Sequence, residues 1–453
     1  MSAERGYSRA IPEADDGATM ELRFINHAGL IVSHGDVRLF EDPWLDGRVF
    51  NNGWQLISRT RFPYEAFADI THLWFSHEHP DHFNPPTLAR IAPEHRARIT
   101  VLFQRTRDGR VVKACRKLGF KSVIEIDPAG WLPIGDGVDV MCERYEEGDS
   151  WLAVRSAGGQ TVLNTNDCGI RDPGRAREIL RRVGPIDVLL SQFSYAYWAG
   201  NPEDTELRRH VAEEKLLGLA RQCEWFRPRQ VVPIASFAWF CHEENFFLND
   251  AINTPRRTFE YLRAHGAGAE PVVLYPDDVL VPGRSQSSED ALSRYQVDYE
   301  QVRHPTALLK STPVTRDTLL AEARAYVEKL RRSPWARLLL RPAHVYLWDL
   351  QRGYRLDLRG MTETDRLERD CDAALSAESL LYCFRFAWGQ DTLAVSGRLH
   401  KPRGAKRYVL FYNYFRFEQL RSRGVEVNAR YLSGTLLRHV GARLRLARAN
   451  TLQ

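Results

Sequence analysis

The stretch "ITHLWFSHEHPDHF", residues 70–83, decides the fold, because an apolar strand runs directly into a cluster of potential metal ligands. His77 and His79 are two residues apart, so on an extended segment their imidazoles point the same way. After Pro80 the chain turns, which lets Asp81 and His82 face a neighbouring point. Imidazole nitrogens and carboxylate oxygens are the donors that borderline and hard cations use. The stretch therefore predicts part of a dinuclear metal site rather than a solvated loop.

The composition is that of a globular protein large enough for two domains. The chain has 453 residues, and 43% of them are hydrophobic. The formal net charge of +5 is modest and comes without blocks of lysine, so nucleic acid is not an expected partner. No apolar run approaches the roughly 18–20 residues that span a bilayer. Residues 1–20 read as a polar, disordered tail without a signal peptide. We therefore expect a cytoplasmic protein that does not associate with membranes.

The cysteines do not form a cofactor motif. The seven are scattered and none forms Cys-x-x-Cys, which favours free thiols in a reducing compartment. The sequence has no Cys-x-His paired with Cys-x-x-His, the pattern of a Rieske cluster, and no glycine-rich phosphate loop or dinucleotide fingerprint. Any redox chemistry would therefore take its electrons from an external donor such as a ferredoxin or a reductase.

The pattern of strands and helices predicts two domains. Short apolar strands alternate with helices over residues 21–285, and polar clusters follow the strand ends, which is typical of a layered α/β domain. The polar run "GRSQSSED" opens a predicted linker, 286–312.

Residues 313–453 predict a smaller α+β accessory domain. We expect an amphipathic helix over 315–332, a hairpin over 344–361, a helix over 363–377, a second hairpin around Gly389 over 380–401, and a basic amphipathic helix over 431–450. The pattern resembles that of sterol-carrier-type lipid-binding domains. Because this region is apolar and aromatic, we expect it to cap the site and form a hydrophobic cavity.

The His-x-His-x-Asp-His motif after an apolar strand resembles the signature of the metallo-β-lactamase superfamily. The preceding "LFEDPWL", residues 39–45, resembles that superfamily's first motif, with Asp42 as its aspartate. The resemblance covers roughly residues 20–285. It implies an αβ/βα four-layer sandwich with a dinuclear site at one edge of the sheets.

The resemblance also implies three further ligands. Asp167, after the strand "TVLNTN", matches the bridging aspartate, and His242, in "PIASFAWFCHEEN", matches the final histidine. The remaining histidine is absent, because no histidine occurs between His95 and His210. Its place falls on Glu146, with Glu147 as the near alternative. The predicted set for one metal is His77, His79, Glu146 and Asp167, and for the other Asp81, His82, His242 and the shared Asp167.

A carboxylate in place of an imidazole favours iron, because it adds negative charge and a harder donor. The diiron hydroxylase of chloramphenicol biosynthesis carries a glutamate at this position, and this sequence resembles that branch. The segments "EDPWLDGRVFNNGW", "LNTNDC", "SQFSYAYWAG" and "ASFAWFCHEENFFLND" also resemble CMP-N-acetylneuraminate hydroxylases without their Rieske domain.

The leading functional hypothesis is an O2-dependent diiron monooxygenase that binds two Fe ions and acts on a small-molecule or carrier-tethered substrate. The alternative is a zinc- or manganese-dependent hydrolase of a phosphodiester, lactone or amide, since this is the commoner use of the fold. A non-catalytic or metal-storage protein is the third.

Several further residues have weaker functional readings. Catalytic candidates beyond the ligands are Tyr195, Glu147 and Glu243, although aromatic residues such as Tyr195 and Tyr197 are more often core. We expect Asp42 to support a ligand rather than bind metal, and Glu244 to orient His242 or simply to be solvated. Cys168 and Cys241 are expected to be buried fillers. The remaining histidines are interpreted as structural: His27, His34, His72, His95 and His210.

Overall fold

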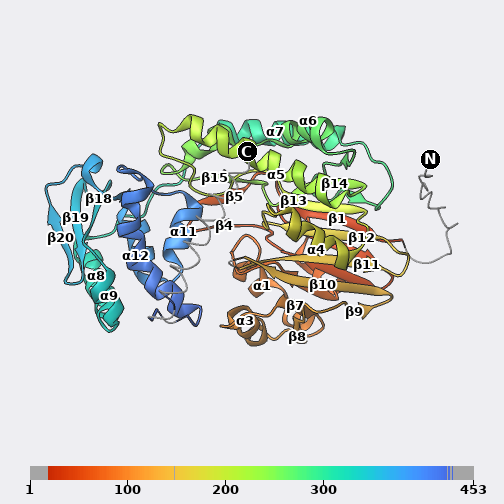
Figure 1. Cartoon of the computed structure of the whole chain (residues 1–453), viewed down its shortest axis with the longest axis horizontal. Helices are drawn as coiled ribbons and strands as arrows, with labels where there is room; N and C mark the ends of the chain where they lie inside the picture. Colours follow the sequence, from red (N-terminus) through yellow and green to blue (C-terminus); the bar gives the residue numbers. More distant parts are fainter. Residues whose placement is uncertain (1–18, 147, 426, 429–430, 432–453) are drawn as a thin grey trace, which may run out of the picture.

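The computed structural model describes residues 19–146, 148–425, 427–428 and 431. Nearly all of the expected N-terminal tail and of the basic helix over 431–450 lies outside these residues. Figure 1 shows two sheets face to face with helices outside them, and a smaller unit on one side. None of the helices in the described part of the chain combines the length and apolar character needed to cross a membrane.

The first seven-stranded sheet carries the metal-binding stretch. Its order is β17-β1-β2-β3-β6-β7-β8, and β3, β6, β7 and β8 run parallel. Its strands are β1 (Glu21–Asn26), β2 (Gly29–His34), β3 (Val37–Glu41), β6 (His72–Phe75), β7 (Thr100–Gln104), β8 (Ser122–Ile126) and β17 (Val279–Leu280).

The second seven-stranded sheet has the order β16-β14-β13-β12-β11-β10-β9. Its strands are β9 (Leu132–Gly135), β10 (Val138–Tyr145), β11 (Asp149–Ser156), β12 (Thr161–Asn166), β13 (Val188–Gln192), β14 (Gln230–Ile234) and β16 (Glu270–Pro271). Strands β12, β13 and β14 are parallel, so their carboxyl ends meet at one edge of the sheet. Buried side chains from both sheets, such as Leu39, Trp74 and Leu152, form one continuous core.

Helices cover the outer face of each sheet, which confirms the predicted four-layer α/β arrangement (Figure 1). The first sheet is covered by α1 (Pro85–Arg90), α2 (Pro93–Arg96) and α3 (Arg110–Leu118), with the 3₁₀ helix η1 (Tyr64–Asp69). The second is covered by α4 (Pro173–Val183), α5 (Thr205–Phe226), α6 (Pro255–His265) and α7 (Glu289–Arg303). A small sheet of β4 (Arg48–Val49), β5 (Trp54–Leu56) and β15 (Ala238–Phe240) lies beside η2 (Phe246–Ala251).

The predicted linker over 286–312 is wrong, because most of it is helix α7. Tyr295 and Tyr299 of this helix are buried in the main core, and the Tyr295 ring stacks on that of Phe237 with 4.7 Å between centroids. The polar run that suggested a linker is the turn that leads into α7, whose first turn carries Glu289 and Asp290. The first domain therefore extends past residue 300.

The accessory region is α+β, as predicted, but two of its elements differ from expectation. Its strands are β18 (Ala343–Leu347), β19 (Arg352–Asp357), β20 (Gly360–Thr364) and β21 (Ala373–Leu375). Its helices are α8 (Arg316–Arg331), α9 (Pro334–Leu339), α10 (Ala377–Arg385), α11 (Gly389–Ser396) and α12 (Gly404–Ser422), with η3 (Glu368–Asp370). The helix expected over 363–377 is instead the end of β20, η3 and β21.

The hairpin expected over 380–401 is two helices, α10 and α11. The alternating sequence "LLYCFRF" suggested a strand, but Ser376 caps a helix by accepting a hydrogen bond from the Ser379 amide. Leu380, Cys383 and Phe384 then follow at helical spacing and are all buried. The cap and the helical face override the alternation.

The accessory region packs on the loops beside the metal-binding stretch. The Trp198 amide donates to the Ala394 carbonyl at 2.8 Å, and Asn245 Nδ2 donates to the Ser396 carbonyl at 2.6 Å. The guanidinium of Arg423 lies 3.6 Å from Glu78, inside the His-rich loop. The expectation that this region covers the site is consistent with these contacts.

Candidate metal centre

The candidate centre lies at the edge where the carboxyl ends of β3, β6 and β12 meet. Four residues that directly end or follow strands there, His27, Asp42, Asn166 and Ala235, have left-handed backbone with φ between 45° and 53°. Such strain in non-glycine residues costs free energy and tends to gather at functional sites. At this edge the left-handed backbone conformation lets the chain turn away sharply at the end of each strand.

His77, His82 and Asp167 form one cluster of potential ligands. The Asp167 Oδ2 atom lies 3.4 Å from His82 Nε2 and 3.9 Å from His77 Nε2. Both imidazoles are buried, and Asp167 is held by Gln192, whose Nε2 donates to Oδ1 at 2.9 Å. A carboxylate in this position can bridge two ions.

A second cluster joins Asp81 and His82 to His27. Asp81 Oδ2 lies 3.3 Å from the Nε2 atoms of both His27 and His82. All three side chains are almost completely buried. His27 comes from the turn after β1, and its carbonyl accepts a hydrogen bond from the Ala235 amide just after β14. The sequence interpretation of His27 as a merely structural residue did not anticipate this position.

Asp149 is the carboxylate that lies beside His77 and His79. Its Oδ1 atom is 3.8 Å from His77 Nε2. Burial and then His77 lower the pKa of His79, and the charges of Asp81 and Asp149 act in the opposite direction. Neither Asp149 nor His79 belongs to the two clusters among the described residues. The His77 and His79 rings are 4.5 Å apart between centroids. Asp149 opens β11, so the donor stands at the start of the strand rather than in the turn before it.

Asp42 supports the ligand His82 by binding its Nδ1 atom, as expected. Its Oδ2 lies 2.9 Å from His82 Nδ1, and Ser76 donates to the same carboxylate through its amide and its hydroxyl, both at 2.8 Å. Asn166 Nδ2 also donates to Oδ2. A carboxylate on one imidazole nitrogen fixes the ring so that the other nitrogen is free for a metal.

The donors present fit a metal ion. The Nε2 atoms of His27, His77 and His82 and the Asp81 Oδ1 atom are buried without a hydrogen-bond partner. Buried polar atoms are normally paired, so several orphans converging on one spot call for an explanation such as an unseen ion. Neither cluster of potential ligands among the described residues contains a cysteine. The set is therefore nitrogen and oxygen only.

Several carboxylates lie close together at the centre, and a bound cation would offset their negative charge. Burial acts to lower the pKa of His82, but Asp81 and Asp42 overcome it and raise the pKa well above its usual value. Burial acts to raise the pKa of Asp167, but His82 holds it down to about 2. For Asp149, burial and then the Asp167 charge raise the pKa to about 6. Neighbouring carboxylates oppose each other's ionisation, which a metal ion between them would relieve.

Glu146 lies outside both clusters. It is exposed at the turn between β10 and β11, with φ of 44°, and is in neither group of potential ligands among the described residues. Glu147 lies outside the described residues. Counting back from the polar start of the strand predicted Glu146, whereas the donor that faces the histidines is Asp149, within the strand itself.

His242 is also placed elsewhere, at the contact with the accessory region. Its Nδ1 accepts from the Glu244 amide at 3.2 Å, and its own amide donates to Asn245. It pairs with Leu309 in an isolated bridge and belongs to neither cluster among the described residues. Glu244 beside it is paired with Arg398 at 2.9 Å, so this glutamate is not a solvated helix start.

The candidate catalytic side chains of Tyr195 and Glu243 belong to neither cluster of potential ligands among the described residues. The Tyr195 hydroxyl donates to the Leu248 carbonyl at 2.5 Å, and burial raises its pKa. Glu243 is exposed, and its amide binds the Leu309 carbonyl. Tyr197 is 37% exposed and lies nearer the surface.

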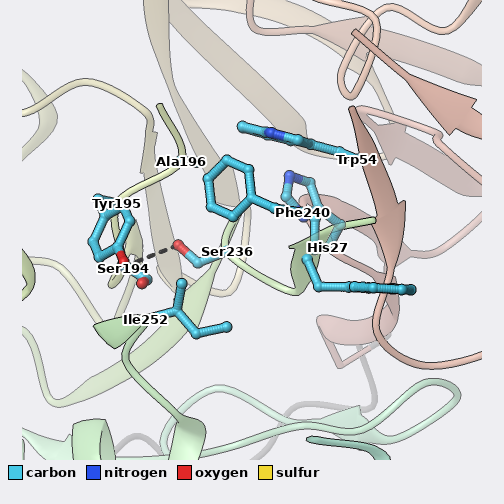
Figure 2. A pocket seen from close by; sticks show the side chains of 10 residues that line it. His27, Trp54, Ser194, Tyr195, Ala196, Ser236, Phe240 and Ile252 are labelled. Carbon is cyan, nitrogen blue, oxygen red and sulfur yellow. Dashed lines mark hydrogen bonds between the residues drawn. The ribbon is translucent and has the colours of Figure 1, made fainter. Parts of the chain in front are cut away.

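A narrow aromatic pocket adjoins His27 (Figure 2). It contains about 270 Å³ of space free of atoms, including solvent at its mouth. Ser194 and Ser236 supply its polar side, where the Ser194 amide donates to Ser236 Oγ at 3.0 Å. Its other lining residues are His27, Trp54, Tyr195, Ala196, Ala238, Trp239, Phe240 and Ile252. Tyr195 thus contributes its ring, not its hydroxyl.

A two-sheet α/β sandwich with a His-x-His-x-Asp-His loop at its edge defines a metallo-β-lactamase-like metal-binding fold. No family model matches the chain. The chain is 29% identical over 274 residues to a Rieske 2Fe-2S iron-sulfur protein of Mycolicibacterium smegmatis, covering 54% of this chain and 51% of the relative. It is 26% identical over 308 residues to cytidine monophosphate-N-acetylneuraminic acid hydroxylase of Danio rerio, covering 62% and 50%. The chain spans about half the length of these relatives.

Solved structures with a similar fold include enzymes of both predicted classes. CmlA, a diiron β-hydroxylase from Streptomyces venezuelae, is 20% identical with a TM-score of 0.40, covering 58% of this chain and 54% of that one. An isothiocyanate hydrolase from Delia radicum gut bacteria is 14% identical with a TM-score of 0.42, covering 59% and 100%. The predicted resemblance to CMP-N-acetylneuraminate hydroxylases is confirmed.

Proposed function

We propose that this chain is an O2-dependent non-haem diiron monooxygenase that inserts one oxygen atom into a small-molecule substrate. The observation that carries the proposal is Asp149, a carboxylate beside His77 and His79. A hydrolase of this fold would carry a histidine among these ligands. A carboxylate adds negative charge and a hard oxygen donor, which favours iron and its higher oxidation states over zinc.

The proposed ligand set differs from the sequence prediction at two positions. Asp149 takes the place of Glu146, and His27 takes the place of His242. His77, His79 and Asp149 would hold one ion, and Asp81, His82 and His27 the other, with Asp167 shared. The distances of 3.3–3.9 Å between donors on neighbouring residues support this grouping.

Bound iron would supply the electrons and open coordination positions with which O2 reacts. The chain's own residues then have distinct tasks. Asp42 holds His82 with Nε2 toward the ions, and Gln192 holds Asp167 by Oδ1 so that Oδ2 faces the histidines. The aromatic rings of Trp44, 5.3 Å from His27, and Phe50, 5.6 Å from His79, exclude water from the histidine edges.

Monooxygenation needs two electrons and two protons from outside, since one oxygen atom enters the substrate and the other leaves as water. The sequence contains no cluster motif that could supply the electrons. A separate ferredoxin or reductase is therefore the proposed donor. Relatives named as a Rieske 2Fe-2S protein and as a hydroxylase support a connection with electron transfer. The substrate is proposed to be a small molecule, free or tethered to a carrier.

The first experiment measures metal content and oxygen reactivity. We expect the protein from iron-supplemented culture to contain about two iron ions per chain and to show a ferric visible absorption that dithionite bleaches. Exposure of the reduced protein to O2 should restore the absorption. Two zinc ions per chain, with hydrolysis unaffected by anaerobic conditions, would replace the proposal with the hydrolase alternative.

A second experiment replaces the carboxylate itself. Asp149→His makes all the unshared ligands of that ion histidines. We therefore expect the variant to keep two metal ions, to favour zinc over iron, and to react with O2 at least tenfold more slowly. Glu146→His is the matched control, because Glu146 is exposed at the neighbouring turn. Unchanged metal preference in Asp149→His, with a change in Glu146→His, would return the ligand role to Glu146.

A further inference from the structure

A lysine lies behind the bridging carboxylate. Lys215, on α5, donates from Nζ to Gln192 Oε1, and the same Gln192 amide donates to Asp167. The pKa of Lys215 is lowered to about 8, chiefly by burial, with Asp167 acting to raise it and the Arg171 guanidinium to lower it. The ammonium therefore still carries a positive charge at neutral pH. It has three N–H donors, of which Gln192 takes one.

Lys215 is half-buried and does not stand alone. Its Nζ atom is 5.5 Å from the centre of the Tyr197 ring. Arg171 is exposed in the loop after β12, and its positive charge acts on the pKa values of both Tyr197 and Lys215. Among the described residues, neither Lys215 nor Arg171 has a carboxylate oxygen within 4 Å, whereas most other buried cations, such as Arg208 and Arg398, do.

The local charge favours an anion at this point. With Asp42, Asp81, Asp149 and Asp167 ionised, the centre carries four negative charges, which two divalent ions would balance. The ions would then neutralise Asp167 and Asp149, the carboxylates whose charges act on Lys215, and the positive charge of Lys215 would be left without a counter-charge. A half-buried ammonium whose hydrogen-bond partner is a neutral amide oxygen gains free energy when an anion binds to its remaining N–H donors.

We propose that Lys215 and Arg171 bind the anionic group, a carboxylate or a phosphate, of the substrate beside the metal centre. The position of the substrate rests on the proposed function, but the anion site does not depend on which metal is present. The apolar remainder of the substrate would lie toward Tyr195, whose ring is 6.4 Å from that of Tyr197 and which lines the pocket beside His27 (Figure 2).

The test measures binding of simple anions to the full-length protein, both as isolated and loaded with zinc, by isothermal titration calorimetry. Benzoate and phenyl phosphate are the charged probes, and benzamide is the neutral control. We expect Lys215→Met to weaken binding of the better anion at least tenfold, Arg171→Gln to weaken it about threefold, and Lys215→Arg to restore most of it. Benzamide should bind weakly and equally to all variants. Whichever of the two anions binds more tightly identifies the charged group of the substrate.

Lys113→Met, at an exposed lysine on α3, is the matched control and should bind like the wild type. Equal affinity of wild type and Lys215→Met would overturn the proposal, since the anion would then sit on the metal alone. Equal affinity for benzoate and benzamide would overturn it too, because the charge would not be recognised. If Lys215→Met loses benzoate binding in both the isolated and the zinc-loaded protein, the anion site stands whichever metal the protein uses, and the metal analysis above decides the proposed function separately.

Discussion

The Nε2 atom of His27 lies 3.3 Å from Oδ2 of Asp81, although the two residues follow different strands of the first sheet. Both are buried, and the second carboxylate oxygen and both imidazole nitrogens have no hydrogen-bond partner. With His82, this pair forms a group of potential ligands that does not include His242, whose contacts are with Glu244 and Leu309.

His27→Gln should therefore remove one of the two metal ions. The amide is a poor ligand, so we expect metal content to fall from about two to about one per chain, measured by plasma emission after extensive dialysis. His242→Gln should keep both ions. His34→Gln, at another buried histidine of the same sheet, controls for general damage. Loss of metal in His242→Gln but not in His27→Gln would reinstate the sequence prediction.

Asp149→Asn tests the other position. Replacing the carboxylate by a neutral amide should weaken binding of the ion shared with His77 and His79 by tenfold or more, measured by competition with a chromophoric chelator. Glu146→Gln should leave this affinity within about twofold, because that side chain is exposed. The opposite ranking would show that the turn rearranges when metal binds.

The His-rich loop and Asp167 could be predicted from sequence because their donors directly follow apolar strands. His27 and Asp149 could not, because their proximity depends on which strand ends meet. His27 reaches the centre only because β1 ends beside β14, where the Ala235 amide binds its carbonyl. Local pattern carries no information on such long-range pairing. The signal that did exist was weak: each residue is a polar donor at a strand boundary.

The fold shows the same division between local and long-range information. Helix α8 confirms the helix expected over 315–332, because Thr315 caps its start by accepting a hydrogen bond from the Thr318 amide and its apolar residues recur at helical spacing. Residues 380–401 were misread because "LLYCFRF" fits both periods, and only the cap at Ser376 and packing in the accessory core decide between them.

Asp42→Asn should weaken metal binding without removing a ligand. The substitution leaves His82 in place but replaces the charged acceptor at Nδ1 with an amide, which permits the wrong orientation of the ring. A loss of about 10–100-fold in metal affinity is expected for such supporting residues. Equilibrium dialysis at several metal concentrations measures it. An unchanged affinity would mean that Ser76 and Asn166 hold the imidazole alone.

Glu41→Gln should stabilise the protein at alkaline pH. Burial raises the pKa of Glu41 from 4.5 to about 8, against the Asn164 hydrogen bond and with help from Asp42. Since the folded-state pKa is raised, the stability that this carboxyl contributes is fully present below about pH 4.5 and is lost as the pH rises through 8. Glutamine stays neutral and can still accept from Asn164.

We expect Glu41→Gln to raise the free energy of unfolding by roughly 2–4 kcal/mol at pH 8 and by less than about 1 kcal/mol at pH 5. Urea denaturation of the metal-free protein at both pH values measures the difference, since metal binding has its own pH dependence. A gain of the same size at both values would show that the effect comes from packing rather than from charge.

Arg398→Met should loosen the contact between the accessory region and the metal domain. Arg398 is fully buried, and its guanidinium binds Glu244 at 2.9 Å, Glu378 at 2.7 Å and the Asn51 carbonyl at 2.6 Å. Removing the cation leaves two buried or half-buried carboxylates unpaired, which typically costs about 3–5 kcal/mol. The free energy of unfolding in urea should fall by about that amount. Arg385→Met, which breaks an exposed pair with Glu322, should cost less than about 1 kcal/mol.

The free energy of unfolding that Arg398→Met loses could come from unpaired carboxylates or from lost packing. Neutralising Glu244 and Glu378 distinguishes the two causes. If unpaired charge is responsible, adding Glu244→Gln and Glu378→Gln to Arg398→Met should recover about half of the stability. If the triple variant is no more stable than Arg398→Met, the arginine acts by filling space. Glu244 adjoins His242, but His242 is not a proposed ligand. Both variants should therefore keep two metal ions per chain. Loss of an ion in the triple variant would show that the accessory region helps to hold the centre.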